Sequence, residues 1–112
     1  MNDDINIYEL IEKEVLSFPE VSRFPDASLT ENIQAVLGRD DINPGIRVSS
    51  DDELLTIQLE ILVYFGVNIP QLCYDIQTRV KRIVEDASGE EVKAVNITVI
   101  GIDAKDDTQE QI

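Results

Sequence analysis

Hydrophobic and polar residues alternate between positions 54 and 65, as they do in a β-strand that turns one face toward a core. One side of this stretch is apolar at every second residue: Leu55, Ile57, Leu59, Ile61, Val63 and Phe65. The other side is polar in its middle and apolar at both ends. Gly66 then provides a turn, and Pro70 suits the first position of a helix. We therefore predict a long strand followed at once by a helix over 70–87, with these apolar residues on one face of that helix: Ile69, Leu72, Cys73, Ile76, Val80, Ile83, Val84 and Ala87.

The other elements are arranged around this strand and helix. Helical spacing predicts a first helix from Ile5 to Phe18, ended by Pro19, and residues 20–27 are interpreted as a connector. The capping box at Ser28 predicts a second helix that ends at Gly38. A short strand at 46–48, a hairpin loop at 49–53 and a last strand at 92–102 complete the sheet.

The predicted fold is α+β, with the elements in the order α-α-β-β-α-β. A right-handed crossover through the helix over 70–87 makes the last strand parallel to the long one. We thus expect a small three-stranded mixed sheet with helices packed on one face. The expected organisation is a disordered N-terminus at 1–4, a single domain at 5–102 and an acidic disordered tail at 103–112.

Composition restricts the chemistry. The 112 residues include 23 Asp and Glu against 9 Lys and Arg, a net charge of −14, which repels nucleic acids and anionic lipids. There is no histidine, the commonest general base and transition-metal ligand. The single cysteine, Cys73, lies on the apolar face of a helix and is interpreted as a buried structural thiol. An acidic start and the lack of an apolar run of about 18 residues predict a cytoplasmic protein.

No catalytic motif is present, so we predict a protein that is not an enzyme and binds no cofactor or metal. The phosphate-binding loop and the dinucleotide glycine fingerprint are both missing. A metal-dependent alternative requires Asp51, Asp52 and Glu53 to converge with Asp40 or Asp41. Such runs in loops are usually solvated surface, and we expect no metal site here.

With helices on only one face, the sheet is expected to expose an apolar patch on the other. A large exposed apolar patch is typical of a protein interface, and we expect a homo-oligomer that uses this one. An alternative is that the segment 28–38 or the tail folds over this face. The candidate self-association residues are Leu54, Leu62, Tyr64, Ile100 and Ile102.

The stretch from residue 45 to 102 resembles the alkaline shock protein family of Gram-positive bacteria. The resemblance rests on the strand 45–48, the long strand ending at 64–66, the helix opened by 68–69 with Gln77 and Val80, and the pattern at 89–102. It implies a non-enzymatic cytoplasmic protein with a role in cell-envelope or alkaline stress, recruited to the inner membrane face by a small membrane-anchored protein.

The resemblance carries over no site residues, so the partner-binding surface is predicted from the chain itself. It combines the turn after the long strand with exposed positions of the following helix, and its alternative is a merely solvated helix face. A different class of function is a KH-like nucleic-acid-binding module, but that requires a G-x-x-G loop between helices, and the turn here has one glycine. The candidate partner-binding residues are Gly66, Asn68, Pro70, Tyr74, Arg79 and Arg82.

Overall fold

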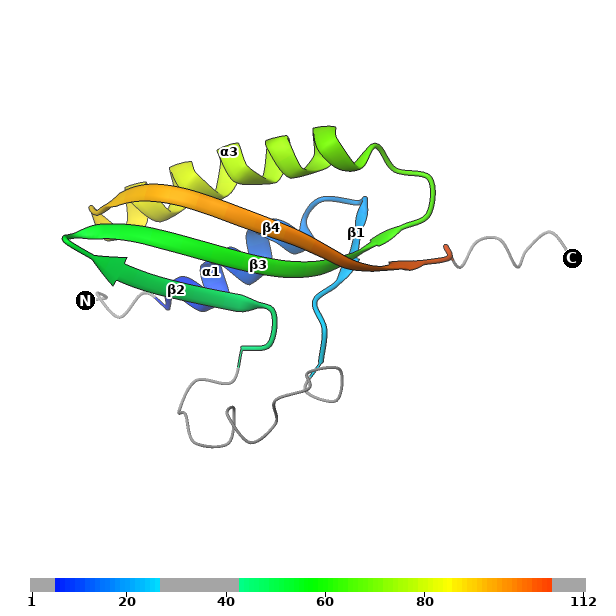
Figure 1. The fold of residues 1–112 in the computed structure, drawn as a ribbon, viewed down its shortest axis with the longest axis horizontal. Coiled ribbons are helices and arrows are strands. Elements are labelled where there is room, and N and C mark those ends of the chain that lie inside the picture. The colour runs from blue at the N-terminus through cyan, green and yellow to red at the C-terminus, as the bar shows by residue number, and fades with distance from the viewer. Residues whose placement is uncertain (1–5, 27–42, 106–112) are drawn as a thin grey trace, which may run out of the picture.

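The computed structural model describes residues 6–26 and 43–105. Its elements are helix α1 (Ile7–Leu16), strand β1 (Val21–Arg23), strand β2 (Ile46–Asp51), strand β3 (Leu54–Tyr64), helix α3 (Ile69–Ser88) and strand β4 (Glu91–Asp103). The predicted segments 1–4 and 28–38 and most of the predicted tail lie outside the described residues. The fold class is α+β, as predicted, and Figure 1 shows the long curved strands β3 and β4 running beneath α3.

Strand β3 is the centre of a mixed sheet. It pairs with β4 in parallel along its whole length, as the crossover rule predicts, and with β2 in antiparallel orientation. The short strand β1 pairs with the last part of β3, on the same side as β2. The predicted count of three strands is therefore corrected to four: β1 lies in the segment interpreted as a connector. Three residues are too few to display a strand period, and pairing with β3 is what makes them a strand.

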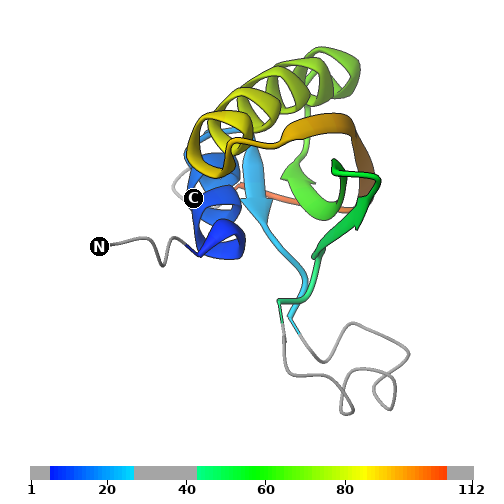
Figure 2. The ribbon, with the colours of Figure 1, turned by 90° about the vertical axis from the view of Figure 1, so that its left-hand side faces the viewer.

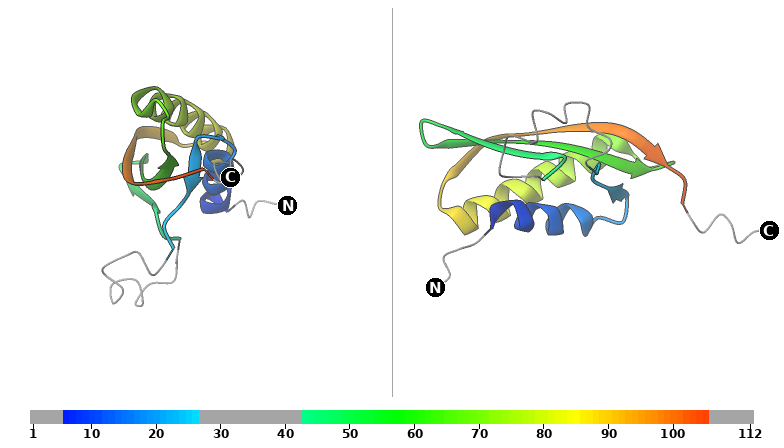
Figure 3. Two further views of the ribbon diagram at one scale, coloured as in Figure 1. Left: turned by 90° about the vertical axis from the view of Figure 1, so that its right-hand side faces the viewer. Right: turned by 90° about the horizontal axis from the view of Figure 1, so that it is seen from below.

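Both helices lie on one face of the sheet, as predicted (Figures 2 and 3). The alternating residues of β3 point toward them and form one core with the apolar stripes of α1 and α3. Ile57, Ile61 and Ile76 are completely buried, and the described residues include no buried polar or charged side chain. The fully buried set at the centre of the core is Ile11, Val15, Ile57, Ile61, Val63, Ile76, Val80 and Val84.

Several boundaries differ from the prediction, among them the end of the first helix, which is Leu16 and not Phe18. The loop between β2 and β3 is two residues, Asp52 and Glu53, both with positive φ of 57° and 67°, so the predicted five-residue loop is too long. Positive φ at both central positions is typical of the tight hairpin turn that fits the sheet's twist. Phe65 follows the end of β3 and is 78% exposed, so it does not extend the core face. Asp103, counted in the predicted tail, is the last residue of β4.

Strand β4 accommodates the length of β3 through two register shifts. Lys93 and Ile100 are extra residues, because Val92 and Ala94 align with consecutive residues of β3, as do Val99 and Gly101. Such bulges bend a strand and increase its twist. The second shift places Gly101 beside Leu62, where an added Cβ would lie 2.9 Å from Leu62 Cδ2. The missing side chain leaves room for Leu62, which exposes only 7% of its surface.

Candidate protein-binding surfaces

The start of α3 is a firmly built turn. Gly66 has φ +92°, which favours glycine, and nothing lies within 4 Å of where its Cβ would be. Asn68 is the N-cap: its side-chain Oδ1 accepts a hydrogen bond from Gln71 N at 3.1 Å. Pro70 occupies the first turn of the helix. These three candidate residues therefore have structural roles in positioning α3, and their solvent-facing surface is available for contact.

The other three partner-binding candidates lie together. Tyr74, Arg79 and Arg82 line a shallow hollow of about 220 Å³ between α3 and the C-terminal end of α1, with Phe18, Asp75 and Thr78. Tyr74 is 62% exposed. The structure thus brings these candidates into one surface that extends from α3 to Phe18, just after the end of α1, while the turn residues Gly66, Asn68 and Pro70 do not line it.

Arg79 is held in place within this hollow. Its Nη1 donates to Glu14 Oε2 at 2.7 Å, and its guanidinium lies 5.0 Å from the centre of the Phe18 ring. An ion pair at a half-exposed site contributes little to stability, so its main effect is on the direction in which Arg79 points. The hollow therefore presents a cationic group beside an aromatic ring.

The five self-association candidates do not form one continuous patch. Leu54 and Leu62 are eight residues apart on β3, about 26 Å at roughly 3.3 Å per residue, and the exposed polar residues Gln58 and Glu60 lie between them. Leu62 is buried against Gly101 and Tyr64 is half-buried. Ile100 and Ile102 are 43% and 56% exposed, both near the end of β4. The exposed apolar surface among the five is thus concentrated on β4.

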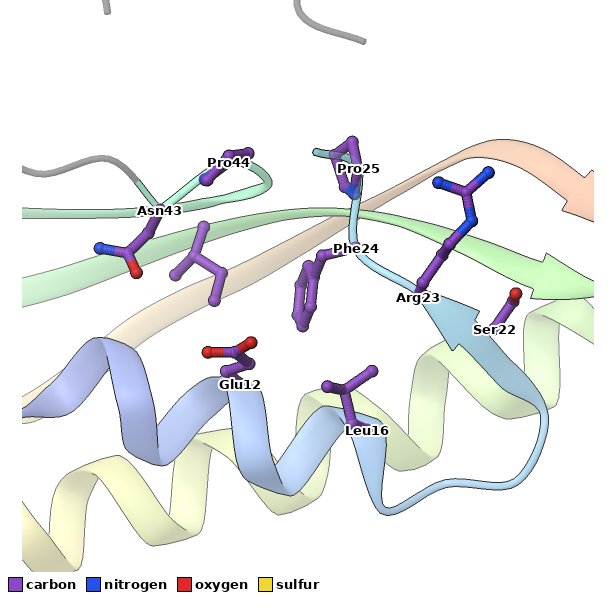
Figure 4. Close-up of a pocket in the computed structure, with 9 residues that line it drawn as sticks. Glu12, Leu16, Ser22, Arg23, Phe24, Pro25, Asn43 and Pro44 are labelled. Carbon is purple, nitrogen blue, oxygen red and sulfur yellow. The ribbon is translucent and has the colours of Figure 1, made fainter. Parts of the chain in front are cut away.

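A second hollow was not found from the sequence. It measures about 400 Å³ and lies between α1, β1 and the start of β2; Figure 4 shows Glu12 and Leu16 rising from α1 toward the ring of Phe24. Its remaining walls come from residues around β1 and β2. The sequence analysis missed this site because it interpreted residues 20–27 as a connector, and the hollow forms only when β1 pairs with β3. The lining residues are Glu12, Leu16, Ser22, Arg23, Phe24, Pro25, Asn43, Pro44 and Ile46.

The end of β4 is fastened to β1 across the sheet. Asp103 Oδ2 accepts hydrogen bonds from Ser22 Oγ at 2.6 Å and from Arg23 Nε at 3.2 Å. The Ser22 bond, followed by the charge of Arg23, holds the pKa of Asp103 below its ordinary value. This carboxylate therefore remains charged at neutral pH, and its hydrogen bonds link β4 to β1 at that end of the sheet.

The carboxylates proposed for a metal site do not converge in the described part of the chain. Asp51, Asp52 and Glu53 are exposed at the tip of the β2–β3 hairpin, while Asp40 and Asp41 lie outside the described residues. Across 6–26 and 43–105, no group of three or more Cys, Asp or Glu side chains is placed to hold a metal ion. Cys73 is only partly buried, so the prediction of a buried thiol is corrected. This partial burial still raises the pKa of the thiol, which disfavours the reactive thiolate.

The KH-like alternative depends on a loop that joins two helices. In this structure the turn with Gly66 joins strand β3 to α3, so it does not have that arrangement.

Within 6–26 and 43–105, none of the helices combines the length and the apolar character that crossing a membrane requires.

These features define a small α+β domain with two shallow hollows that are open to solvent. The sequence profile of the alkaline shock protein 23 family, described as having a cell envelope-related function, matches residues 11–104, and the chain belongs to this family. The resemblance seen in the sequence is thereby confirmed.

Two relatives from Bacillus subtilis (strain 168) are similar to the chain. The uncharacterized protein YloU is 28% identical over 74 residues, which is 66% of this chain and 62% of that protein. The uncharacterized protein YqhY is 27% identical over 66 residues, 59% of this chain and 49% of that protein. The matched region thus spans about half to three fifths of these relatives. No solved structure matches the chain significantly.

Proposed function

We propose that this protein is a non-catalytic binding domain that acts at the cell envelope through other proteins, including a membrane-anchored partner and further copies of itself. The family's cell envelope-related function supports the setting. The observation that carries the binding role is the hollow formed by Phe18, Tyr74, Arg79 and Arg82, in which an exposed tyrosine and two arginines of α3 lie beside the ring of Phe18. Tyrosine and arginine are, with tryptophan, the side chains enriched among residues that dominate binding energy.

Recruitment by a protein is favoured over direct lipid binding. The net charge of −14 opposes approach to an anionic leaflet. Stable attachment of a peripheral protein to lipid usually requires a basic amphipathic helix or covalent lipid. On the exposed face of α3 the two arginines, Arg79 and Arg82, lie beside Asp75. This face is therefore not basic. The protein would therefore be peripheral to the inner face of the membrane, through its partner.

The test separates a protein partner from lipid. Purified protein is mixed with membranes from its own cells, with the same membranes after protease treatment, and with vesicles made from their extracted lipids. We expect sedimentation with the first only. Binding to the lipid vesicles, or equal binding to protease-treated membranes, would contradict the proposal.

A pair of charge-matched variants locates the site. Arg82→Ser should weaken membrane binding about tenfold, the effect expected on removing one dominant contact. Arg47→Ser removes the same charge from the exposed face of β2 and should leave binding unchanged. Equal weakening by both variants would show that net charge, and not the hollow, determines binding.

A further inference from the structure

The larger hollow, between α1, β1 and the start of β2, combines apolar walls with a carboxylate. Leu16 exposes 42% of its surface here, although it is a large aliphatic side chain. Figure 4 shows Glu12 beside it on α1, with its carboxylate turned toward the ring of Phe24. The volume of about 400 Å³ falls within the roughly 300–1,000 Å³ typical of ligand pockets. The hollow is therefore large enough to receive a long side chain of another molecule.

The walls of this hollow are packed against one another. The chain just after β1 and the start of β2 meet at Gly45, where an added Cβ would touch both Phe24 and Pro25. The main-chain hydrogen bond from Glu60 N to Gly45 O joins this contact to β3. The ring of Phe24 is thus positioned by two strands that are distant in the sequence.

The uncompensated charge in this hollow is negative. Glu12 and Arg23 are its two charged lining residues. Arg23 Nε donates to Asp103 Oδ2 at 3.2 Å, so the charge of this guanidinium is compensated. The side chain of Glu12 has no hydrogen bond or ion pair across 6–26 and 43–105. The hollow therefore presents a free carboxylate, in a chain whose net charge is −14.

The same chain shows which side chain a carboxylate and a ring of this kind receive. On the opposite side of α1, Glu14 accepts a hydrogen bond from Arg79 at 2.7 Å, and the guanidinium lies 5.0 Å from the centre of the Phe18 ring. Glu12 and Phe24 repeat this combination, and in the described part of the chain neither holds an arginine. A guanidinium matches it because it pairs with carboxylates through two parallel hydrogen bonds and stacks on aromatic rings.

We propose that the larger hollow receives an arginine side chain from a basic segment of a partner protein. The guanidinium lies against Glu12 and Phe24, and the aliphatic stem lies against Leu16. The negative field of the chain favours the approach of such a segment. Because the hollow is open to solvent, a small free amine would leave much of its surface in water, whereas a protein segment adds contacts around the rim.

This inference goes beyond the proposed function, because it assigns a second surface. The larger hollow and the hollow around Arg79 have no lining residue in common. The two surfaces also suit partners of different chemistry, since the first presents a free carboxylate and the second presents arginines.

The probe for the experiment is a capped peptide, Gly-Ser-Leu-Arg-Ser-Gly. It is titrated into isotope-labelled protein, and the amide signals are followed by nuclear magnetic resonance. A matched peptide carries citrulline, which has the shape of arginine without its charge. We expect the arginine peptide to shift the amide signals of Glu12, Leu16 and Phe24, and the citrulline peptide to shift them much less. Equal shifts with both peptides, or shifts confined to other parts of the chain, would overturn the proposal.

Two charge-matched variants separate the hollow from the general field of the chain. Glu12→Gln should weaken binding of the arginine peptide about fivefold, near the upper limit for an exposed ion pair. Glu91→Gln removes the same charge at the start of β4, outside the hollow, and should leave binding unchanged. The spectra themselves show that each variant is folded. Equal weakening by both variants would mean that net charge alone attracts the peptide, and the hollow would lose its role.

Other occupants of the hollow give different results. Arg39 is the one cation in the sequence from 27 to 42, which joins the two sides of the hollow. Peptide binding by Arg39→Gln but not by the wild type would identify this chain's own arginine as the occupant. Self-association that Glu12→Gln weakens would identify a second copy, and either result would overturn the proposal.

The outcome is independent of the hollow around Arg79. Membrane binding that Arg82→Ser weakens would support the proposed function even if the arginine peptide does not bind. Peptide binding that depends on Glu12, with membrane binding that does not depend on Arg82, would do the reverse.

Discussion

Gly45 is the residue where a single added methyl group should be most damaging. It has φ +89°, and a Cβ built on it would lie 2.8 Å from Glu60 O, 2.8 Å from Pro25 Cδ and 2.9 Å from Phe24 Cδ1. The carbonyl of Gly45 also accepts a hydrogen bond from Glu60 N at 2.9 Å. The glycine is therefore the close contact where the chain leaving β1, the start of β2 and the middle of β3 meet.

The cost of Gly45→Ala has two parts. Left-handed backbone costs an L-residue about 1–2 kcal/mol, partly offset by about 0.4–1 kcal/mol because alanine restricts the unfolded chain. The contact with a main-chain oxygen cannot be relieved by a side-chain rotation, and overpacking of this kind costs about 1–3 kcal/mol more. We expect a total between about 1 and 5 kcal/mol with a central value of about 3 kcal/mol, a large share of the roughly 5–15 kcal/mol typical of a domain.

Gly66→Ala is the matched control. Gly66 has nearly the same φ, +92°, but nothing lies within 4 Å of its added Cβ, so only the backbone part of the cost applies. Urea unfolding followed by circular dichroism should show a fall in midpoint of about 2 M for Gly45→Ala and well under about 1 M for Gly66→Ala, for a denaturant slope of about 1.5 kcal/mol/M. Equal shifts for the two variants would refute the argument that the steric contact matters.

Two further predictions concern titrating groups. The hydrogen bond from Val92 N, helped by Lys81, holds the pKa of Glu85 in the folded protein below its ordinary value of 4.5. The ionised carboxylate therefore stabilises the fold above pH 4.5, and this stabilisation is lost as the pH falls through the lower pKa of the folded state. Unfolding experiments from pH 7 to 3 should thus show stability falling in acid, and Glu85→Gln should be less stable at pH 7 with a shallower acid dependence; an unchanged profile would contradict the role of this carboxylate. Because burial raises the pKa of Cys73, its alkylation by iodoacetamide at pH 8 should be several-fold slower in the folded protein than in urea, and equal rates would show an accessible thiol.

The sequence by itself determined the elements that carry their own periodic pattern. Alternation along β3 and the apolar stripe of α3 each repeat often enough to identify the element, and local signals such as Pro70 and Gly89 mark where the helix begins and ends. The crossover between these strands also follows from local handedness, so the parallel pairing of β3 and β4 was predictable. The same reasoning selected Tyr74, Arg79 and Arg82 as exposed positions of α3.

Tertiary structure decided what depends on residues distant in the sequence. Strand β1 exists because Val21 lies beside Val63, a pairing that three residues cannot signal on their own. The hollow around Arg79 needs Glu14 of α1 and Phe18 just after that helix, and Leu62 is buried because a shift in β4 places Gly101 next to it. The hydrogen bonds from Gln77, Lys81 and Glu85 of α3 to the start of β4 likewise form only when helix and strand pack together. Periodicity records which face of an element is apolar, but the partner of that face is set only when the chain packs.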